Sequence, residues 1–419
     1  MNDQASPLAT VPALPLAGVR VLEVASHVFV PAASALLAEW GAEVVKVEHP
    51  ETGDAYRGLV TAGLHRRVHG VDVQFQQANR SKDSVGIDLS TEEGQALLHR
   101  LAADADVFLT SHREGVRRRL GIELEEIRRA NPTIVYVRGS GYGPEGPDAD
   151  QGAYDHAAYW ARTGMAARMA GDGDPQPPPP AFGDYAAALA LAAGVASALY
   201  RRATTGEPVE LDVSLLGAGL WQLQPDVVDG VLDRAIGDDS STNRRPRTRF
   251  DVVNPLVGMY RTADGRHVSL VMIEADRHWA DLCERLGVPE LRDDPRFADA
   301  GARRANSRAC VEALDAVFAT RSLDDWCRAL DGATGVWAPV RRPDEVAEDP
   351  QVQSNGYVSS LDLGGGNELP VVTSPVRFGG RPGIVRRAPE VGEHTEDVLL
   401  RSGLGWDEIT ALKDAGAIT

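Results

Sequence analysis

The N-terminal part of the chain carries the pattern that most restricts its fold. Residues 19–25 are an apolar run typical of a buried strand, residues 31–40 have the composition of a helix that ends at Gly41, and residues 44–48 resemble a second strand. A strand, a helix and a strand within about 30 residues form a right-handed βαβ unit with parallel strands. The sequence therefore predicts an α/β fold with a doubly wound sheet.

Such a sheet binds its ligand in a crevice beyond the carboxyl ends of the strands, which places residues 26–30 and 48–53 at the rim. Further strands are expected at 85–89, 105–109 and 134–137. No G-x-G-x-x-G pattern follows the first strand, and the chain has no Walker P-loop. These absences disfavour enzymes that depend on NAD, FAD or simple ATP binding.

A single carboxylate, Asp184, lies between Gly183 and an alanine-rich helix predicted over residues 185–202. Gly183 permits unusual backbone angles and the close approach of a ligand. Free N–H groups and the helix dipole favour an ionised side chain at a helix N-terminus, so we expect Asp184 to be a carboxylate that acts as nucleophile or base. The other interpretation is that Asp184 only caps the helix, which is the commonest use of Asp at this position.

The length of 419 residues fits two domains better than one. Strands at 256–260 and 267–273 flank Asp264-Gly265, a strong hairpin-turn signal, and helices follow at 279–286 and 309–319. These elements predict a small α+β domain inserted into a large domain. The expected parts are a flexible leader (1–14), the first part of the large domain (15–224), the small domain (225–332) and the return to the large domain (333–419).

Charge and cysteine content narrow the range of partners. A formal net charge of −18 disfavours nucleic acid, because phosphate binding needs a basic face. Cys283, Cys310 and Cys327 form no C-x-x-C pair, which disfavours a disulfide framework or a zinc site. No stretch approaches the apolar length of a membrane span, and no signal peptide is evident. We expect a cytoplasmic protein with no nucleic-acid or membrane partner and no metal site.

Three other segments carry chemically useful side chains. The arginines at 117–119 form a basic cluster that is most simply a solvated helix face. The glycine-rich loop at 139–147 follows a strand and suits the close approach of an extended ligand. A helix expected over 151–169 carries Tyr-Asp-His at 154–156, a spacing that does not suit metal ligation.

Eight sequence blocks, each weak alone, together resemble the family III CoA transferases, which include formyl-CoA transferase and the carnitine-CoA transferases, and the related α-methylacyl-CoA racemases. The blocks keep the family's order and extend from residue 15 to near the C-terminus. They are residues 15–23 (PLAGVRVLE), 41–48 (GAEVVKVE), Asn79 with Lys82 and Asp88-Leu89, 141–143 with 146–147, Gly183-Asp184, Asp264-Gly265, 294–297 (DPRF) and 392–395 (GEHT).

The resemblance implies a Rossmann-like large domain formed by both chain ends, an inserted small α+β domain, and an interlocked-ring homodimer. Asp184 matches the family's nucleophile. The implied reaction moves CoA from an acyl-CoA thioester to a carboxylic acid through covalent aspartyl intermediates, without a permanently bound cofactor, because covalent catalysis preserves the free energy of the thioester. The oxyanions that form need N–H donors, for which the loop at 139–143 is the candidate. Residues placed around the nucleophile are Tyr154, Asp155, Gly141 and Gly183.

Family positions that contact CoA match this chain less evenly. Arg119 is the well-matched phosphate ligand, whereas Ser111-His112 stands where the family usually has Asn-Phe. Glu207-Pro208 replaces the usual Gly-Gln, and the glycine tetrad that covers the active site in some members has no counterpart in the small domain. The matched CoA-binding positions are Ser26, Val28, Phe29, His49, Ile87, Ser90, Ser111 and Arg119.

Two alternatives remain beside the transferase. Racemases carry Gly-His-Asp where this chain has Ala153-Tyr154-Asp155, and a tyrosine, with an ordinary pKa of about 10, replaces a proton-transferring histidine poorly. His156 would project from a different face of its helix, so the transferase is favoured. The second alternative is a non-catalytic acyl-CoA-binding subunit of a heteromeric transferase. Aromatic residues near Asp184 favour a bulky or apolar acyl group without identifying donor or acceptor; they are Tyr159, Trp160, Phe182 and Tyr185.

Overall fold

The computed structural model describes residues 14–171, 173–237, 249–380, 383 and 385–419, which form two compact units. The large unit comprises the described parts of Met1–Ala166, Gln176–Gln224 and Pro350–Thr419, and the small unit comprises those of Ala167–Pro175 and Pro225–Asp349. Segments before and after the small unit therefore both belong to the large unit. Apart from Leu14, the predicted leader lies outside the described residues.

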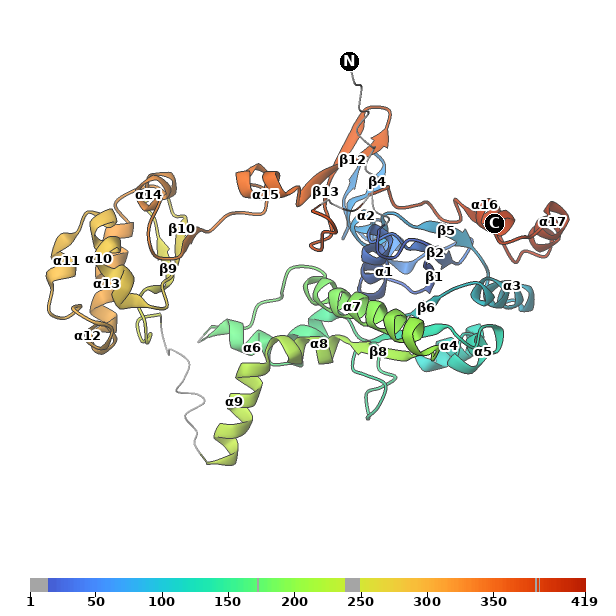
Figure 1. The fold of residues 1–419 in the computed structure, drawn as a ribbon, viewed down its shortest axis with the longest axis horizontal. Coiled ribbons are helices and arrows are strands. Elements are labelled where there is room, and N and C mark those ends of the chain that lie inside the picture. The colour runs from blue at the N-terminus through green and yellow to red at the C-terminus, as the bar shows by residue number, and fades with distance from the viewer. Residues whose placement is uncertain (1–13, 172, 238–248, 381–382, 384) are drawn as a thin grey trace, which may run out of the picture. The chain divides into compact units, whose positions relative to one another are not determined.

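The large unit is built on a six-stranded parallel sheet with the order β5-β2-β1-β6-β7-β8 (Figure 1). This confirms the parallel α/β sheet expected from the sequence. The chain continues from β1 to β2 on one side of β1 and later returns to place β6 on the other side of β1. The direction in which strands are added to the sheet therefore reverses beside β1. The strands are β1 (Arg20–Val24), β2 (Glu43–Glu48), β5 (Asp83–Gly86), β6 (Val107–Thr110), β7 (Val135–Ser140) and β8 (Glu210–Ser214).

Helices cover both faces of this sheet because successive strand residues point to opposite sides. Val21 of β1 belongs to the core that includes α1 (Phe29–Glu39) and α7 (Phe182–Thr205). The next residue, Leu22, belongs to a second core formed with the helices of the other face. Those helices are α3 (Glu92–Ala103), α5 (Leu124–Ala130), α16 (Thr395–Arg401) and α17 (Trp406–Asp414).

By length and composition, α7 is apolar enough to cross a membrane, with a mean hydropathy of 1.5 in its best window. This corrects the expectation that no stretch approaches that length. One face of α7 packs against α1 in the core, with Ala188, Leu191 and Val195 buried. A core helix of a folded unit meets the same length test, so α7 is weak evidence for a membrane span.

The small unit contains a three-stranded antiparallel sheet with the order β11-β10-β9. The turn between β9 and β10 holds Gly265 at φ 77°, as the hairpin signal predicts. Its elements are β9 (Val257–Arg261), β10 (His267–Val271), α10 (Ala275–Leu286), α11 (Pro289–Asp293), α12 (Ala300–Ala305), α13 (Ser307–Phe318), α14 (Leu323–Leu330) and β11 (Trp337–Pro339).

Three sequence expectations about secondary structure are wrong. Residues 336–340 do not return to the large unit, because Trp337 and its neighbours pair with β10 as the third strand of the small sheet. The helix expected over 151–169 is a π-helical turn, η2 (His156–Ala161), followed by the short helix α6 (Met165–Ala170). The strands that the sequence predicts within residues 371–400 lie mostly before that range, in β12 (Val358–Gly364) and β13 (Asn367–Val372).

The remaining connections are short elements. They are η1 (Ala55–Leu59), β3 (Arg67–Val68), β4 (Val71–Asp72), α2 (Val73–Asn79), α4 (Glu114–Leu120), α8 (Leu215–Gln222), α9 (Gln224–Ala235), η4 (Val346–Glu348) and α15 (Pro350–Asn355).

The C-terminal block at 392–395 covers the edge strand β5. The N–H of His394 donates to the carbonyl oxygen of Ser84 at 2.9 Å, and the N–H of Gly86 donates to the Thr395 hydroxyl at 3.0 Å. The block therefore attaches the last segment of the chain to the sheet, which gives these residues a structural role.

Candidate active site

A cavity of about 1360 Å³ lies in the large unit at the carboxyl ends of the strands. Its wall includes residues that follow β1 and β6 and the end of β7, together with Asp184 from α7 and several residues of α4. This is the place where a doubly wound sheet binds its ligand. Sequence-predicted site residues in its lining are Ser26, Val28, Phe29, Ser111, Gly141, Tyr154 and Asp184.

Asp184 lies in the first turn of α7, which begins at Phe182, earlier than expected. The residue before the helix, Ala181, has a left-handed backbone with φ 59°, so Asp184 is not the N-cap residue. Its side chain is half-buried. Burial, followed by the nearby charge of Asp155, raises the pKa of Asp184 from 3.8 to about 7. Burial and a like charge therefore oppose the stabilisation of the carboxylate that the sequence argument expected from the helix terminus.

Asp155 is buried beside the start of α7. Its Oδ2 accepts the N–H of Gly183 at 3.1 Å, and its Oδ1 accepts the N–H of His156 at 2.8 Å. Asp155 thus joins η2 to the helix that carries Asp184. Two carboxylates near one another favour the protonated form of one of them, in agreement with the raised pKa of Asp184.

The backbone does not require a glycine at position 183, because the φ of Gly183 is not left-handed. Packing requires it instead. A Cβ at this position would overlap the ring of Tyr159, which is fully buried and bonds through its hydroxyl to Gln222. The glycine therefore lets α7 begin directly on that ring, and this contact fixes the position of Asp184.

The glycine loop after β7 also depends on close contacts. A Cβ on Gly139 would overlap Val30, and a Cβ on Gly141 would overlap Ala153. Of the N–H groups predicted to be oxyanion donors, that of Gly143 already donates to Ser140 Oγ at 3.1 Å. The loop forms part of the cavity wall, but Gly143 is engaged within the loop itself.

Beneath the cavity lies a buried ion network that contains several residues of the resemblance blocks. Lys46 Nζ is 2.8 Å from Glu23 Oε1 and 2.8 Å from Asp54 Oδ2. Lys82 Nζ is 2.8 Å from Glu23 Oε2 and 2.9 Å from Asn79 Oδ1. Burial alone would raise the pKa of Glu23, but Lys46 and Lys82 lower it to about 2. The network joins the carboxyl-terminal halves of β1 and β2 to the start of β5.

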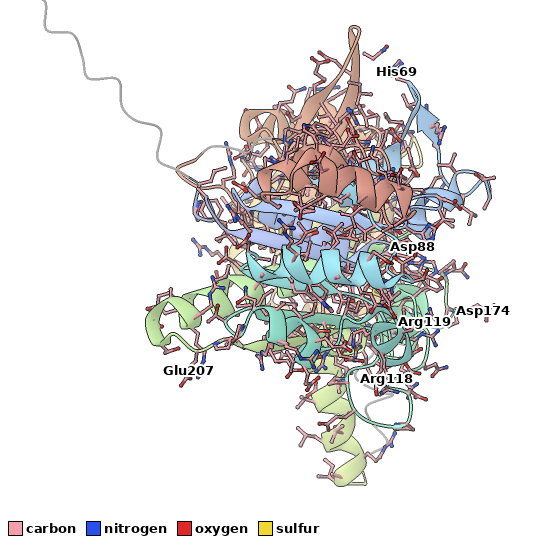
Figure 2. The ribbon with its side chains drawn as sticks, turned by 90° about the vertical axis from the view of Figure 1, so that its right-hand side faces the viewer. His69, Asp88, Arg118, Arg119, Asp174 and Glu207 are labelled. Carbon is pink, nitrogen blue, oxygen red and sulfur yellow. The ribbon has the colours of Figure 1, made fainter. Side chains whose placement is uncertain are left out.

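The other predicted CoA contacts lie outside the cavity lining. Ile87 is part of the core and pairs with Ile418, and His49 Nδ1 accepts the N–H of Glu51 at 3.2 Å. The N–H of Ser90 donates to Asp88 in an exposed turn. Arg119 projects from α4 at the surface of the large unit (Figure 2). The cavity lining does not include these four residues.

Sequence reasoning missed several cavity residues. The same helix as Arg119 supplies Arg117 and Arg118 to the lining, and Arg113 precedes that helix. The run at 117–119 signals a basic helix, but only the helix orientation shows which arginines reach the cavity. His112 also lines it, and burial, with Lys46 nearby, lowers the pKa of this imidazole to about 4.

His27 lies within the rim predicted at residues 26–30 and lines the same cavity as Asp184, but sequence reasoning assigned it no role of its own. Its position next to Ser26 at the predicted rim was the available signal. Its backbone is left-handed, with φ 69°, which no sequence pattern indicated.

The aromatic residues near Asp184 pack mainly on one another. Trp160 lies edge-on to Phe182 with ring centres 6.0 Å apart, and its Nε1–H donates to the carbonyl oxygen of Gln176 at 2.9 Å. Tyr159 belongs to the core. None of these three lines the cavity, so they give little support for a bulky acyl group. In the described part of the chain, no group of three or more His, Cys, Asp or Glu side chains is arranged to hold a metal ion.

Comparisons with known proteins agree on one group. The model of CoA-transferase family III matches residues 16–395. The (R)-2-hydroxy-4-methylpentanoate CoA-transferase of Clostridioides difficile is 29% identical over 96% of this chain and 99% of its own length. The probable fatty acyl-CoA transferase Rv3272 of Mycobacterium tuberculosis is 31% identical over 93% of this chain and 98% of its own. The crystal structure of a CAIB/BAIF family protein from Brucella suis superposes with a TM-score of 0.79 at 27% identity, covering 93% of this chain and 100% of that one.

Proposed function

The chain belongs to CoA-transferase family III and is an enzyme of that family; from this premise we propose that it moves CoA from an acyl-CoA thioester to a carboxylic acid with Asp184 as nucleophile. The observation that carries the proposal is the position of Asp184. It lines the cavity at the carboxyl ends of the sheet, on a helix start fixed by the Gly183–Tyr159 contact. A fixed carboxylate in the wall of a ligand cavity suits covalent catalysis.

The proposed reaction proceeds through covalent intermediates. Ionised Asp184 attacks the thioester carbonyl, the C–S bond breaks, and CoA thiolate leaves a mixed anhydride. The thiolate then attacks the aspartyl carbonyl and expels the donor as a free carboxylate, which leaves an aspartyl-CoA thioester. The acceptor carboxylate attacks the aspartyl carbonyl of this thioester, the C–S bond breaks, and CoA thiolate leaves a second mixed anhydride. The thiolate then attacks the acceptor carbonyl, the anhydride C–O bond breaks, and the new acyl-CoA and the Asp184 carboxylate are released. Each step keeps an activated acyl bond, so no ATP is consumed.

The raised pKa of Asp184 has a direct consequence for this reaction. With a pKa of about 7, part of the enzyme carries a protonated Asp184 at neutral pH and only the ionised part attacks. A carboxylate that is less solvated and more basic is also a stronger nucleophile once ionised. Asp155 therefore affects the reaction both by holding Gly183 and by raising the pKa of Asp184.

We further propose that CoA occupies the same cavity with its phosphates toward α4. Arg113, Arg117 and Arg118 line that part of the wall and offer guanidinium groups to phosphate oxygens. Ser26, Val28, Phe29 and Ser111 line the wall near the strand ends. In this proposal the neighbours of Arg119 on the same helix, and not Arg119 itself, contact the phosphates.

Intact-protein mass spectrometry tests the covalent mechanism. The protein is incubated with acyl-CoAs whose acids follow those named for the relatives, which include a 2-hydroxy acid, a dicarboxylic acid and a fatty acid. Hydroxylamine is then added to trap an activated aspartyl group as its hydroxamate. We expect a mass change that maps to Asp184, is absent in Asp184→Ala, and persists in the control Asp104→Ala, which alters an exposed carboxylate. Trapping at another residue, or undiminished trapping in Asp184→Ala, would contradict the proposal.

One observation favours a racemase as the second candidate. A group with a pKa of about 7 suits proton transfer, and Asp184 has such a pKa. Tyr154, in the place of the racemase histidine, is 66% exposed. Exchange of the α-proton of a 2-methylacyl-CoA with solvent deuterium, without any adduct on Asp184, would support the racemase. Bound CoA without turnover or exchange would instead support a non-catalytic subunit.

We also propose that the enzyme is a homodimer of interlocked chains. The support is the division of the chain, in which one compact unit is assembled from segments before and after the other. Light scattering at several protein concentrations tests the stoichiometry. A monomer that retains full activity would contradict this proposal.

A further inference from the structure

His27 has an unusual backbone for a non-glycine residue. Its φ of 69° is left-handed, a conformation that side chains with a Cβ adopt rarely and at a cost. The surrounding structure imposes it, because the N–H of His27 donates to Asp54 Oδ1 at 3.0 Å and that carboxylate is paired with buried Lys46. The adjacent N–H of Ser26 donates to Ser111 Oγ at 3.0 Å. His27 is therefore fixed directly after β1, where the strand order reverses.

This backbone directs the imidazole to the cavity wall. The ring lies edge-on to Tyr154 with ring centres 5.4 Å apart, and its centre is 6.4 Å from that of Tyr56. Tyr56 is close enough to Asp184 that, after burial, the aspartate is among the charges that raise the pKa of its hydroxyl. His27 and Asp184 thus both lie near the buried ring of Tyr56 and line one cavity.

Within the described residues, no side chain or backbone group hydrogen-bonds to the imidazole of His27. An imidazole carries at least one N–H donor in every protonation state. A donor that no protein group uses, fixed at a cavity wall near the nucleophile, is free to bond to substrate.

We propose that His27 is a further catalytic residue, whose ring N–H donates a hydrogen bond to the carbonyl oxygen of the acyl group that Asp184 attacks. The proposal rests on the proposed transferase function. Negative charge grows on that oxygen when the carboxylate adds, and an oriented donor stabilises it most at that point. The N–H of Gly143 already donates to Ser140, so the glycine loop offers one donor fewer than expected, and His27 adds a side-chain donor in the same cavity.

The left-handed backbone determines which substitutions are informative. His27→Gly removes the ring and retains the backbone, because glycine adopts positive φ freely. His27→Asn retains a side-chain N–H donor in a residue type that also tolerates this conformation. Alanine is unsuitable, since a loss of activity would then include backbone strain.

The test is the rate of adduct formation on Asp184 in a single turnover with an acyl-CoA, followed by mass spectrometry. We expect His27→Gly to be slower by about 100- to 1000-fold, as for the loss of one oxyanion donor. We expect His27→Asn to recover part of the rate, and added imidazole to restore His27→Gly. The dissociation constant of CoA, measured by calorimetry, should change less than about twofold.

The outcomes separate this proposal from the transferase itself. If wild type forms no adduct on Asp184, the transferase mechanism fails whatever His27 does. If wild type forms the adduct and His27→Gly forms it at the same rate, only the role of His27 is refuted. A slow His27→Gly enzyme that neither imidazole nor the asparagine substitution improves would also refute it, because the loss would then come from structure and not from a missing donor.

Discussion

Replacing Asp184 by asparagine should remove a pH-dependent destabilisation of the folded protein. The folded-state pKa of Asp184 is about 7, above its ordinary value of 3.8. Between these two values the folded protein holds a proton that the unfolded chain releases, so the contribution of this group to stability is complete below pH 3.8 and is lost as pH rises to 7. Asparagine cannot ionise, so the variant keeps its stability over this range.

The magnitude follows from the shift. About three pKa units at about 1.36 kcal/mol each give a ceiling of roughly 4 kcal/mol. Asp184 is only half-buried and solvent screens its charge, so we expect a smaller swing of about 1–2 kcal/mol between pH 5 and pH 8.5.

Urea unfolding at several pH values measures this effect as the difference in unfolding free energy between Asp184→Asn and wild type. The difference should grow in favour of the variant as pH rises, and should level off above pH 7. The control Asp104→Asn alters an exposed carboxylate and should show no such trend. A difference for Asp184→Asn that stays constant with pH would refute the argument that burial and Asp155 raise this pKa.

Three other perturbations follow from the same geometry. The kcat/KM of the transferase should rise with pH to a plateau above about 7, and Asp155→Asn should move the midpoint of this pH profile to lower pH. Initial rates in overlapping buffers measure both effects, and an unchanged midpoint would exclude Asp155 as a cause of the raised pKa of Asp184. Gly183→Ala should cost about 1–3 kcal/mol of stability and most of the activity, because the new Cβ overlaps Tyr159. The control Gly115→Ala, with nothing within 4 Å of its Cβ, should have a thermal unfolding midpoint within a few degrees of that of the wild type. Lys82→Met should cost about 3–5 kcal/mol in urea unfolding, because it removes the buried ammonium that binds Glu23 Oε2 and Asn79 Oδ1 and leaves Lys46 to compensate the buried carboxylates. Arg118→Ala breaks an exposed pair with Glu114 and should cost less than about 1 kcal/mol; equal costs would contradict the importance of burial.

Much of the fold could be predicted from local patterns. The apolar runs around β1 and β2 and the helix between them have the order and spacing of a βαβ unit, and they form one in the structure. The hairpin at Asp264-Gly265 was likewise marked by residues that favour its turn. Such elements are predictable because their periodicity and turn residues act over a few neighbours.

Errors arose where a segment's partner is distant in sequence. Residues 336–340 have the composition of a strand for either unit, and only pairing with β10 assigns them to the small sheet. The run at 117–119 marked a basic helix, yet its orientation brings Arg117 and Arg118, and not Arg119, to the cavity. A sequence pattern describes a helix without fixing its rotation about the axis.

The same distinction applies to the site. The sequence by itself determined that one carboxylate, Asp184, follows a glycine at the start of a long helix, and that a crevice lies beyond the parallel strands. Tertiary structure decided the environment of that carboxylate, because burial and then the charge of Asp155 raise its pKa. It also decided the position of His27, whose backbone is held by Asp54 from a separate segment. Burial and electrostatic partners depend on which distant residues come together, and local sequence does not encode that directly.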